Sequence, residues 1–321
     1  MKRKLFTLLL TALILCRTVF AAPSFLIPGG KAVGIELFTD GLLVTRLEDD
    51  SPASRAGIRI GDRIMEADGT PLSGVGQLAD RVAEGSAVVL SINRNGRAAE
   101  FLLTPEQSPE GYRLGLFLRD RIAGIGTVTY YDPLTGGFGA LGHGVSDTHG
   151  DTLLAVSSGV LIASEVSSVT KGARGRPGAL QGSFFPEEAV GVVESNTVHG
   201  IFGSATAVPL SPAIPLAEPG EVRLGNAEIY ANVEGTRIER FSVRIEKLHA
   251  TAENGRNLLL RVTDERLLGI TGGIVQGMSG SPILQNGKLV GAVTHVLVSD
   301  PTMGYGIFIQ NMLDEITEEE K

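Results

Sequence analysis

The chain of 321 residues contains one cysteine, no tryptophan and only 5% aromatic residues. The cysteine, Cys16, lies in an apolar run near the N-terminus, so the rest of the sequence holds no thiol. This excludes disulfides, zinc–cysteine sites and a cysteine nucleophile from the main body of the protein. The scarcity of aromatic side chains argues against a surface on which nucleic-acid bases stack.

Positive charge is also scarce outside the N-terminal segment. The whole chain has a formal net charge of −8, although its first 21 residues hold four basic residues and no acidic one. The remainder is therefore four units more negative, at −12. Such an acidic body repels a phosphate backbone, so nucleic acid is not an expected partner.

The first 22 residues have the layout of an export signal. Lys2, Arg3 and Lys4 precede an apolar run over residues 5–16, and small residues follow at 21–22. This order is typical of a secretory signal, and the run is shorter than the roughly 20 apolar residues that span a membrane. Arg17, directly after the run, leaves an uncleaved membrane anchor as the alternative. We therefore expect an exported protein with a possible membrane association.

Glycine is abundant, with 42 residues, and short β-branched runs recur between the glycines. Many short strands with closely spaced turns predict a mainly β fold. Residues 113–316 are expected to form one double β-barrel domain, and residues 105–112 a polar linker. The C-terminal end, residues 311–321, is expected to be a short acidic helix or an acidic tail.

Residues 30–105 have the turns of a small separate module. Ser51 suits a helix N-cap, Pro52 the first helical position and Gly57 the C-cap. Asp68-Gly69 is a hairpin signal. The string SPASRAGIRIGDRIMEADGTPL, which begins at Ser51, closely resembles the PDZ family in the permuted form of bacterial exported proteases.

This resemblance implies a peptide-binding function for the module. PDZ domains bind an extended peptide as an added strand at a sheet edge. The resemblance places the loop that binds a peptide carboxylate at four residues, Ala32, Val33, Gly34 and Ile35. The alternative is a scaffold module without a free peptide ligand.

The string Gly277-Met278-Ser279-Gly280-Ser281-Pro282 presents a serine in a glycine-rich turn. It resembles the nucleophile loop of trypsin-like serine proteases, which places the nucleophile at Ser279 rather than Ser281. A glycine at 277 allows its own N–H and that of Ser279 to converge on one developing oxyanion. A non-catalytic glycine–serine hairpin is the alternative.

A second glycine-rich segment carries His143, within the sequence GALGHGVSD. Histidine suits a general base near neutral pH, and His143 precedes the serine, as in chymotrypsin-like enzymes. His295 is the rival base. The carboxylate that orients the base is left open by spacing, with Asp264, Asp147 and Asp300 as candidates.

Together, the strings GTVTYYDPLTGGFGALGHGVSD and TGGIVQGMSGSPILQNGKLVGAVTHVLVSDPTMGYGIF closely resemble the stage IV sporulation protein B peptidases. The resemblance implies a catalytic set of His143, Asp264 and Ser279, with no metal or cofactor. It implies a serine endopeptidase that is exported into the space between forespore and mother-cell membranes. There it cuts itself and a regulator of an intramembrane protease, which signals late mother-cell sigma-factor activation.

Two other classes of function remain open from the sequence. One is a PDZ-type binding protein with an inactive protease domain. The other is an extracytoplasmic quality-control protease that degrades unfolded proteins broadly. The breadth of cleavage distinguishes the second class from a signalling protease, and the effect of a Ser279→Ala substitution distinguishes the first.

Overall fold

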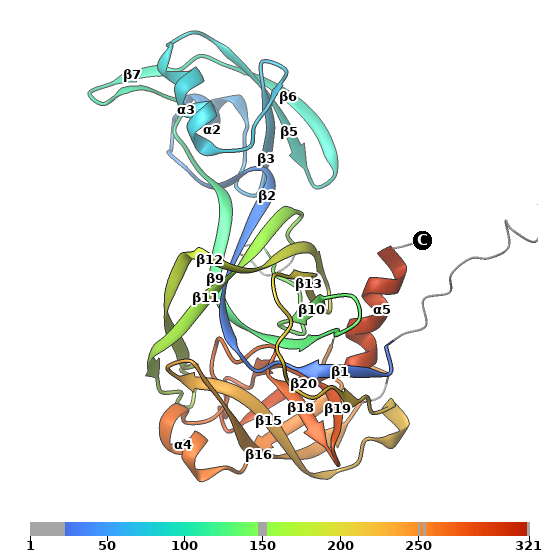
Figure 1. Ribbon diagram of the computed structural model, residues 1–321. Helices are drawn as coiled ribbons and strands as arrows, with labels where there is room; N and C mark the ends of the chain where they lie inside the picture. The colour runs from blue at the N-terminus through green and yellow to red at the C-terminus, as the bar shows by residue number, and fades with distance from the viewer. Residues whose placement is uncertain (1–22, 147–152, 250, 253–254, 320–321) are drawn as a thin grey trace, which may run out of the picture.

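The computed structural model describes residues 23–146, 153–249, 251–252 and 255–319. The expected export signal and Asp147 lie outside these residues. The fold is mainly β, as predicted, with two stacked barrels and a smaller domain that projects from one of them (Figure 1). No helix within the described ranges is long and apolar enough to cross a membrane.

The first barrel is a ring of six strands. In ring order they are β2 (Ala32–Leu47), β9 (Leu116–Tyr131), β10 (Gly137–Ala140), β13 (Gly200–Ala205), β12 (Ala179–Thr197) and β11 (Val156–Thr170), and the β9–β2 pairing closes the ring. Alternate residues of these strands point inward, as the two-residue period of a strand requires. Val128, Phe138, Leu161 and Val193 form its buried core.

The second barrel is also closed and has six strands. They are β15 (Gly225–Glu234), β16 (Arg237–Leu248), β17 (Leu258–Val262), β20 (Met303–Phe308), β19 (Lys288–Val296) and β18 (Pro282–Gln285). The core contains Ile229, Phe241, Leu260 and Val290. Helix α4 (Glu265–Thr271) precedes β18, and a 3-10 turn, η1 (Pro219–Glu221), precedes β15.

The N- and C-terminal segments pack together where the two barrels meet. Strand β1 (Phe25–Pro28) pairs with β9 and with β14 (Ile214–Pro215). Helix α5 (Ile309–Glu319) buries Met312 and Leu313 in a cluster that also contains Leu26 and Tyr130. Of the two alternatives for the C-terminal end, the structure shows a helix, and residues 25–28 form a strand on the edge of the first barrel.

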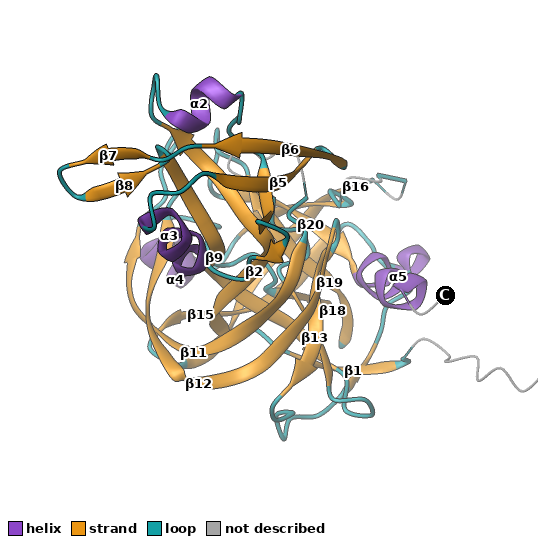
Figure 2. Cartoon of the chain, turned by 90° about the horizontal axis from the view of Figure 1, so that it is seen from above, coloured by secondary structure: helices purple, strands orange, loops and turns teal. Residues whose placement is uncertain are grey.

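The smaller domain, residues 40–119, is inserted in the sequence between two neighbouring strands of the first barrel, and we call it the inserted domain. Strands β2 and β9 leave the barrel side by side and continue into this domain (Figures 1 and 2). Between them the chain forms α2 (Pro52–Ala56), β3 (Arg63–Ala67), β4 (Thr70–Pro71), α3 (Val75–Ala83), β5 (Val88–Arg94), β6 (Arg97–Leu103), β7 (Glu106–Ser108) and β8 (Gly111–Arg113).

Local signals of this domain hold in the structure. The Ser51 hydroxyl accepts a hydrogen bond from Ser54 N as the N-cap of α2, and Gly57 closes the helix with a φ of 90°. Asp62, only 1% exposed, receives two hydrogen bonds of 2.6 Å from the Arg94 guanidinium. Leu42, Ile64, Leu90 and other apolar residues form a core separate from those of the barrels.

The expected boundaries of the small module require one correction. The sequence places its start at residue 30, but residues 32–38 pair with β9 and β11 inside the first barrel. The reason is that β2 is one continuous strand of 16 residues. Its first half closes the barrel and its second half, from Leu42, belongs to the inserted domain.

Candidate active site

Ser279 lies in the turn between α4 and β18, where the second barrel meets the first. Thr127 of β9 holds this turn: its N–H donates to Ser279 O at 2.9 Å and its hydroxyl to Gly277 O at 2.8 Å. Gly280 has a φ of +96°, and a Cβ there would lie 1.9 Å from Thr127 O. The turn therefore needs glycine in order to contact the first barrel so closely.

The backbone around Ser279 leaves two N–H groups available. Within the described chain, the N–H groups of Gly277 and Ser279 donate to no protein acceptor, whereas Met278 N donates to Val275 O at 3.1 Å. Gly277 has a φ of +96°. Two free N–H groups flanking the nucleophile are what an oxyanion hole requires. The assignment of this role to Gly277 and Ser279 is consistent with the structure and stays a prediction.

His143 follows β10 and is oriented by its own backbone. Its Nδ1 lies 2.8 Å from Gly144 O. A carbonyl oxygen only accepts, so Nδ1 carries the proton and Nε2 keeps a free lone pair. Burial lowers the pKa of His143, and the Gly144 carbonyl partly opposes that shift. His143 is thus neutral near pH 7, as a general base must be.

His143 and Ser279 line one cleft between the barrels. This cleft has a volume of about 440 Å³. Its walls come from both barrels and from the β11–β12 hairpin, and include Ile122, Ile125, Leu141, Pro177, Val275 and His295. The Ser279 hydroxyl donates to Thr294 O at 3.0 Å, so it must turn toward His143 before the histidine can remove its proton.

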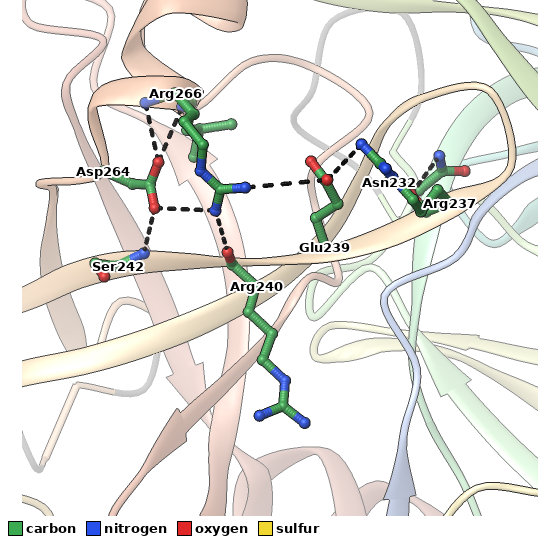
Figure 3. A network of polar contacts seen from close by, with 8 residues as sticks. Asn232, Arg237, Glu239, Arg240, Ser242, Asp264 and Arg266 are labelled. Atoms are coloured by element: carbon green, nitrogen blue, oxygen red, sulfur yellow. Dashed lines mark hydrogen bonds and ion pairs between the residues drawn. The ribbon is translucent and has the colours of Figure 1, made fainter.

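Asp264 is not part of this cleft, which corrects the predicted catalytic set. It is the N-cap of α4: Oδ1 accepts from Arg266 N at 3.0 Å and from Leu267 N at 3.3 Å. Oδ2 accepts from Ser242 N at 3.3 Å and from the Arg266 guanidinium at 3.4 Å (Figure 3). The carboxylate is therefore engaged in capping a helix of the second barrel.

The electrostatics of Asp264 agree with this structural role. Partial burial works to raise the pKa of Asp264, but the N–H groups of Leu267 and Ser242 and the Arg266 guanidinium outweigh it and hold the pKa below its usual value. Aspartate at an N-cap is a preferred structural choice in any helix. The sequence signal for a catalytic acid and that for a cap coincide at this residue.

Asp300, the rival acid that the structure describes, is engaged elsewhere. Asp300 Oδ1 accepts from the Thr302 hydroxyl at 2.6 Å, and Oδ2 lies 3.8 Å from Arg261. Asp147 is outside the described residues. Among the residues that the structure describes, the group bonded to the His143 ring is the Gly144 carbonyl. Within the described ranges, a backbone carbonyl and not a carboxylate therefore orients the base.

His295, which the sequence offers only as a rival base, is a neighbour of His143. The two ring centroids lie 4.9 Å apart with a tilt of 36°. His295 Nδ1 is buried, and no hydrogen bond reaches it from the described part of the protein. Burial, followed by the charges of His143 and Arg256, lowers the pKa of His295 to about 4. This neutral ring excludes water from one side of the base.

The peptide-binding loop predicted at Ala32–Ile35 is also corrected. These residues form part of β2, and Val33, Gly34 and Ile35 each pair with β9 on one side and β11 on the other. A strand paired at both edges cannot accept an added peptide strand. The resemblance placed the loop in the first half of β2, whereas the module contains only the second half.

A better carboxylate site lies at Leu114 and Gly115, just before β9. Their carbonyls accept hydrogen bonds from Ala53 N and Glu48 N, both at 3.0 Å, while in the described structure neither of their N–H groups has an acceptor. Gly115 has a φ of +74°. Consecutive free N–H groups form a concave anion site. The sequence signal for this site was Gly115, which lies between two leucines directly ahead of a strand.

Comparison with known proteins identifies both parts of the chain. Residues 110–313 match the family model described as SpoIVB peptidase S55, and residues 43–94 match a PDZ domain. A protein of Halomonas elongata described as a DegP-like periplasmic serine endoprotease is 33% identical over 76 residues, 23% of this chain and 16% of that protein. A protein of Lactococcus lactis described as a zinc metalloprotease, LL2128, is 25% identical over 97 residues, 30% of this chain and 21% of that protein.

The chain thus spans about a fifth of the length of these curated relatives. Among solved structures, the inactive form of the Rv3671c protease of M. tuberculosis is 14% identical. That match covers 60% of this chain and 83% of the other, with a TM-score of 0.36.

A serine and a histidine that face one cleft between two β-barrels are the arrangement that trypsin-like serine peptidases use. The family match spans more than half of the chain and contains both residues. The protein belongs to the SpoIVB peptidase S55 family, and it carries a PDZ domain within its first barrel.

Proposed function

We propose that this protein is an exported signalling protease that cuts few sites: its own N-terminal region and a regulator of an intramembrane protease. In this proposal it acts between the forespore and mother-cell membranes during endospore formation. Membership of the SpoIVB peptidase family supports the proposal. The basic and apolar N-terminal sequence supports export.

The chemistry is acyl transfer, carried by the placement of Ser279 and His143 in one cleft. The Ser279 hydroxyl leaves Thr294 O and attacks the substrate carbonyl carbon while His143 Nε2 takes its proton. The carbonyl oxygen becomes an oxyanion that accepts from Gly277 N and Ser279 N. His143 then protonates the leaving amine, and water hydrolyses the acyl-enzyme by the reverse sequence of proton transfers.

The cleft also supports selective rather than broad cleavage. In the described structure the Ser279 hydroxyl is bonded to Thr294 O and not to the base. A substrate that occupies the cleft must shift this hydroxyl, so binding energy is spent on completing the site. Such an enzyme discriminates between good and poor substrates in the catalytic step.

The test is mass spectrometry of the purified exported chain, with the wild type beside Ser279→Ala. We expect the wild type to shorten its N-terminus over hours and the variant to stay intact. A mixture of unfolded proteins added to both samples measures breadth, and we expect few Ser279-dependent cuts. Identical trimming of both chains, or Ser279-dependent degradation of most added proteins, would contradict the signalling proposal.

A further inference from the structure

Strand β9 connects the PDZ domain directly to the catalytic cleft. It begins beside the free N–H groups of Leu114 and Gly115 and reaches the Ser279 turn at Thr127. Its first half pairs with β2 in the PDZ domain, at Leu116 to Arg119, and its middle lines the cleft at Ile122 to Ile125. One strand therefore borders both sites, with no linker between them (Figure 1).

One edge of this strand is open over the whole distance. Residues 116–119 and 121–125 of β9 pair with β2, with a register shift at Asp120 between the two groups, and within the described chain the other edge of both groups pairs with no strand. From Val128 onward β10 covers that edge, and at Thr127 the Ser279 turn does. An unpaired edge is a template for an added strand. Phe117, Ala123 and Gly124 are exposed along it.

Helix α3 borders the PDZ end of this open edge. Asp120 Oδ2 on β9 accepts from Val75 N, the first residue of α3, at 3.1 Å. Figure 2 shows α3 beside the first half of β9, on the side away from β2. The open edge of β9 thus begins beside α3 in the PDZ domain and ends in the cleft between the two barrels.

We infer that one extended C-terminal segment of a protein substrate binds along this edge of β9, from its free carboxylate at Leu114 and Gly115 to its scissile bond at Ser279. This inference rests on the proposed peptidase function and adds the class of substrate. Two features favour such a segment. The open edge of β9 is continuous with the cleft, and the two free N–H groups suit a terminal carboxylate.

The direction of β9 gives the segment its polarity. An antiparallel strand added to β9 runs from the Ser279 turn toward the PDZ domain, so its C-terminus arrives at Leu114 and Gly115. The PDZ domain then holds the residues that follow the scissile bond. Cleavage of the scissile bond produces a C-terminal fragment, and this fragment remains bound at the PDZ end.

The length of the edge sets the position of the cut. The open residues 116–125 of β9 match a partner strand of the same number of residues, because paired strands rise equally, by about 3.3 Å per residue. The scissile bond therefore lies about ten residues before the C-terminus of the substrate. The PDZ domain and the barrel together act as a fixed ruler.

The experiment uses the full chain and a synthetic library of randomised peptides of about 24 residues. One half has free C-terminal carboxylates and the other has amidated C-termini, with Ser279→Ala as the catalytic control. Sequencing of the products locates each cut relative to the C-terminus. We expect Ser279-dependent cuts to cluster about ten residues before free carboxylates, and amidation to remove the cluster.

A second measurement tests the strand itself on the best-cut peptide. N-methyl groups on alternate residues of the part of the tail that lies opposite Arg121 to Ile125, placed in one of the two possible phases, remove the N–H groups that face β9. We expect kcat/KM to fall about tenfold or more in one phase and to stay near the unmethylated value in the other. Equal effects of both phases would overturn strand addition.

The outcomes separate this inference from the function on which it rests. Ser279-dependent cuts that are spread along the peptides, or that ignore amidation, overturn the ruler and leave the peptidase intact. The absence of any Ser279-dependent cut overturns both. A cluster measured from the N-terminus of the peptides reverses the polarity and also overturns the inference.

Discussion

The two barrels differ in how the chain builds them. The second barrel uses one continuous stretch, from β15 to β20, and carries the nucleophile Ser279. The first barrel is interrupted between β2 and β9 by the PDZ domain and carries the base His143. The nucleophile therefore sits on a self-contained unit, whereas the base sits on a unit whose strands are shared with a binding domain.

This difference shows which part of the active site is structurally connected to the PDZ domain. Strands β2 and β9 run from the PDZ domain into the first barrel, and β9 lines the wall of the cleft at Ile122 and Ile125. Among the described strands of the second barrel, none continues into the PDZ domain. The contact of Thr127 with the Ser279 turn is the point at which the two units meet.

The largest effect is expected from removing either catalytic side chain. Ser279→Ala and His143→Ala should each lower kcat by about 10⁶-fold, and the double variant should be no slower than either one, because the two residues act as a unit. Hydrolysis of a peptide measures this, with thermal unfolding as the check on folding. If the double variant instead lost kcat by the product of the two single effects, Ser279 and His143 would contribute to catalysis independently.

Next in size is the contact between the barrels. Gly280→Ala should lower the free energy of unfolding by about 3 kcal/mol and abolish activity, because the new Cβ would lie 1.9 Å from Thr127 O. Gly287→Ala is the matched control: it has a φ of +78° but no atom within 4 Å, and should cost about 1–2 kcal/mol. Urea unfolding compares the two variants. Equal losses of unfolding free energy would mean that backbone strain alone, and not the contact with Thr127, causes the destabilisation.

A smaller, local effect is expected in the PDZ domain. Arg94→Ala leaves the buried carboxylate of Asp62 without its cation and should destabilise that domain by about 3 kcal/mol. Hydrogen exchange should then quicken in β3 and β5 but not in β16 and β17. The exposed Arg97→Ala, on the same hairpin, should change stability by less than about 0.5 kcal/mol. Equal exchange in all four strands would contradict the separation of the two units.

The most subtle effect is a shift in pH dependence. Catalysis needs neutral His143, whose pKa burial lowers, so kcat/KM should persist below pH 6.5 and fall only as the pH passes the lowered pKa. His295→Ala admits water beside the base, weakens that burial and should move the acid limb to higher pH. His295→Phe keeps the site dry and should leave the limb near its wild-type position. An unchanged or lowered limb in the alanine variant would contradict this role of His295.

Several features of the protein were visible in the sequence because local chemistry decides them. Ser51 and Gly57 cap α2 through contacts within a few residues. The glycines around Ser279 allow the turn that the sequence predicted, and His143 follows a short strand as expected. Each of these depends on backbone conformation close to the residue itself.

Two predictions failed where pairing between distant segments decides. The PDZ resemblance placed a carboxylate-binding loop at Ala32–Ile35, but the segment is part of a barrel strand, and Val33 to Ile35 are paired at both edges. The family resemblance implies Asp264 as the catalytic acid, yet its oxygens bind the N–H groups of α4 and β16. No local pattern states which carboxylate lies nearest a histidine more than a hundred residues away.

The sequence by itself determined the family of the protein and the presence of a PDZ module, and it predicted the nucleophile and the base. The tertiary structure alone decided that this module is inserted between two strands of the first barrel, that Gly144 O orients His143 and that His295 adjoins His143. It also decided that one open strand edge joins the PDZ domain to the cleft. The reason is physical: turns and caps depend on neighbouring residues, whereas register and closure depend on partners that the chain meets only after folding.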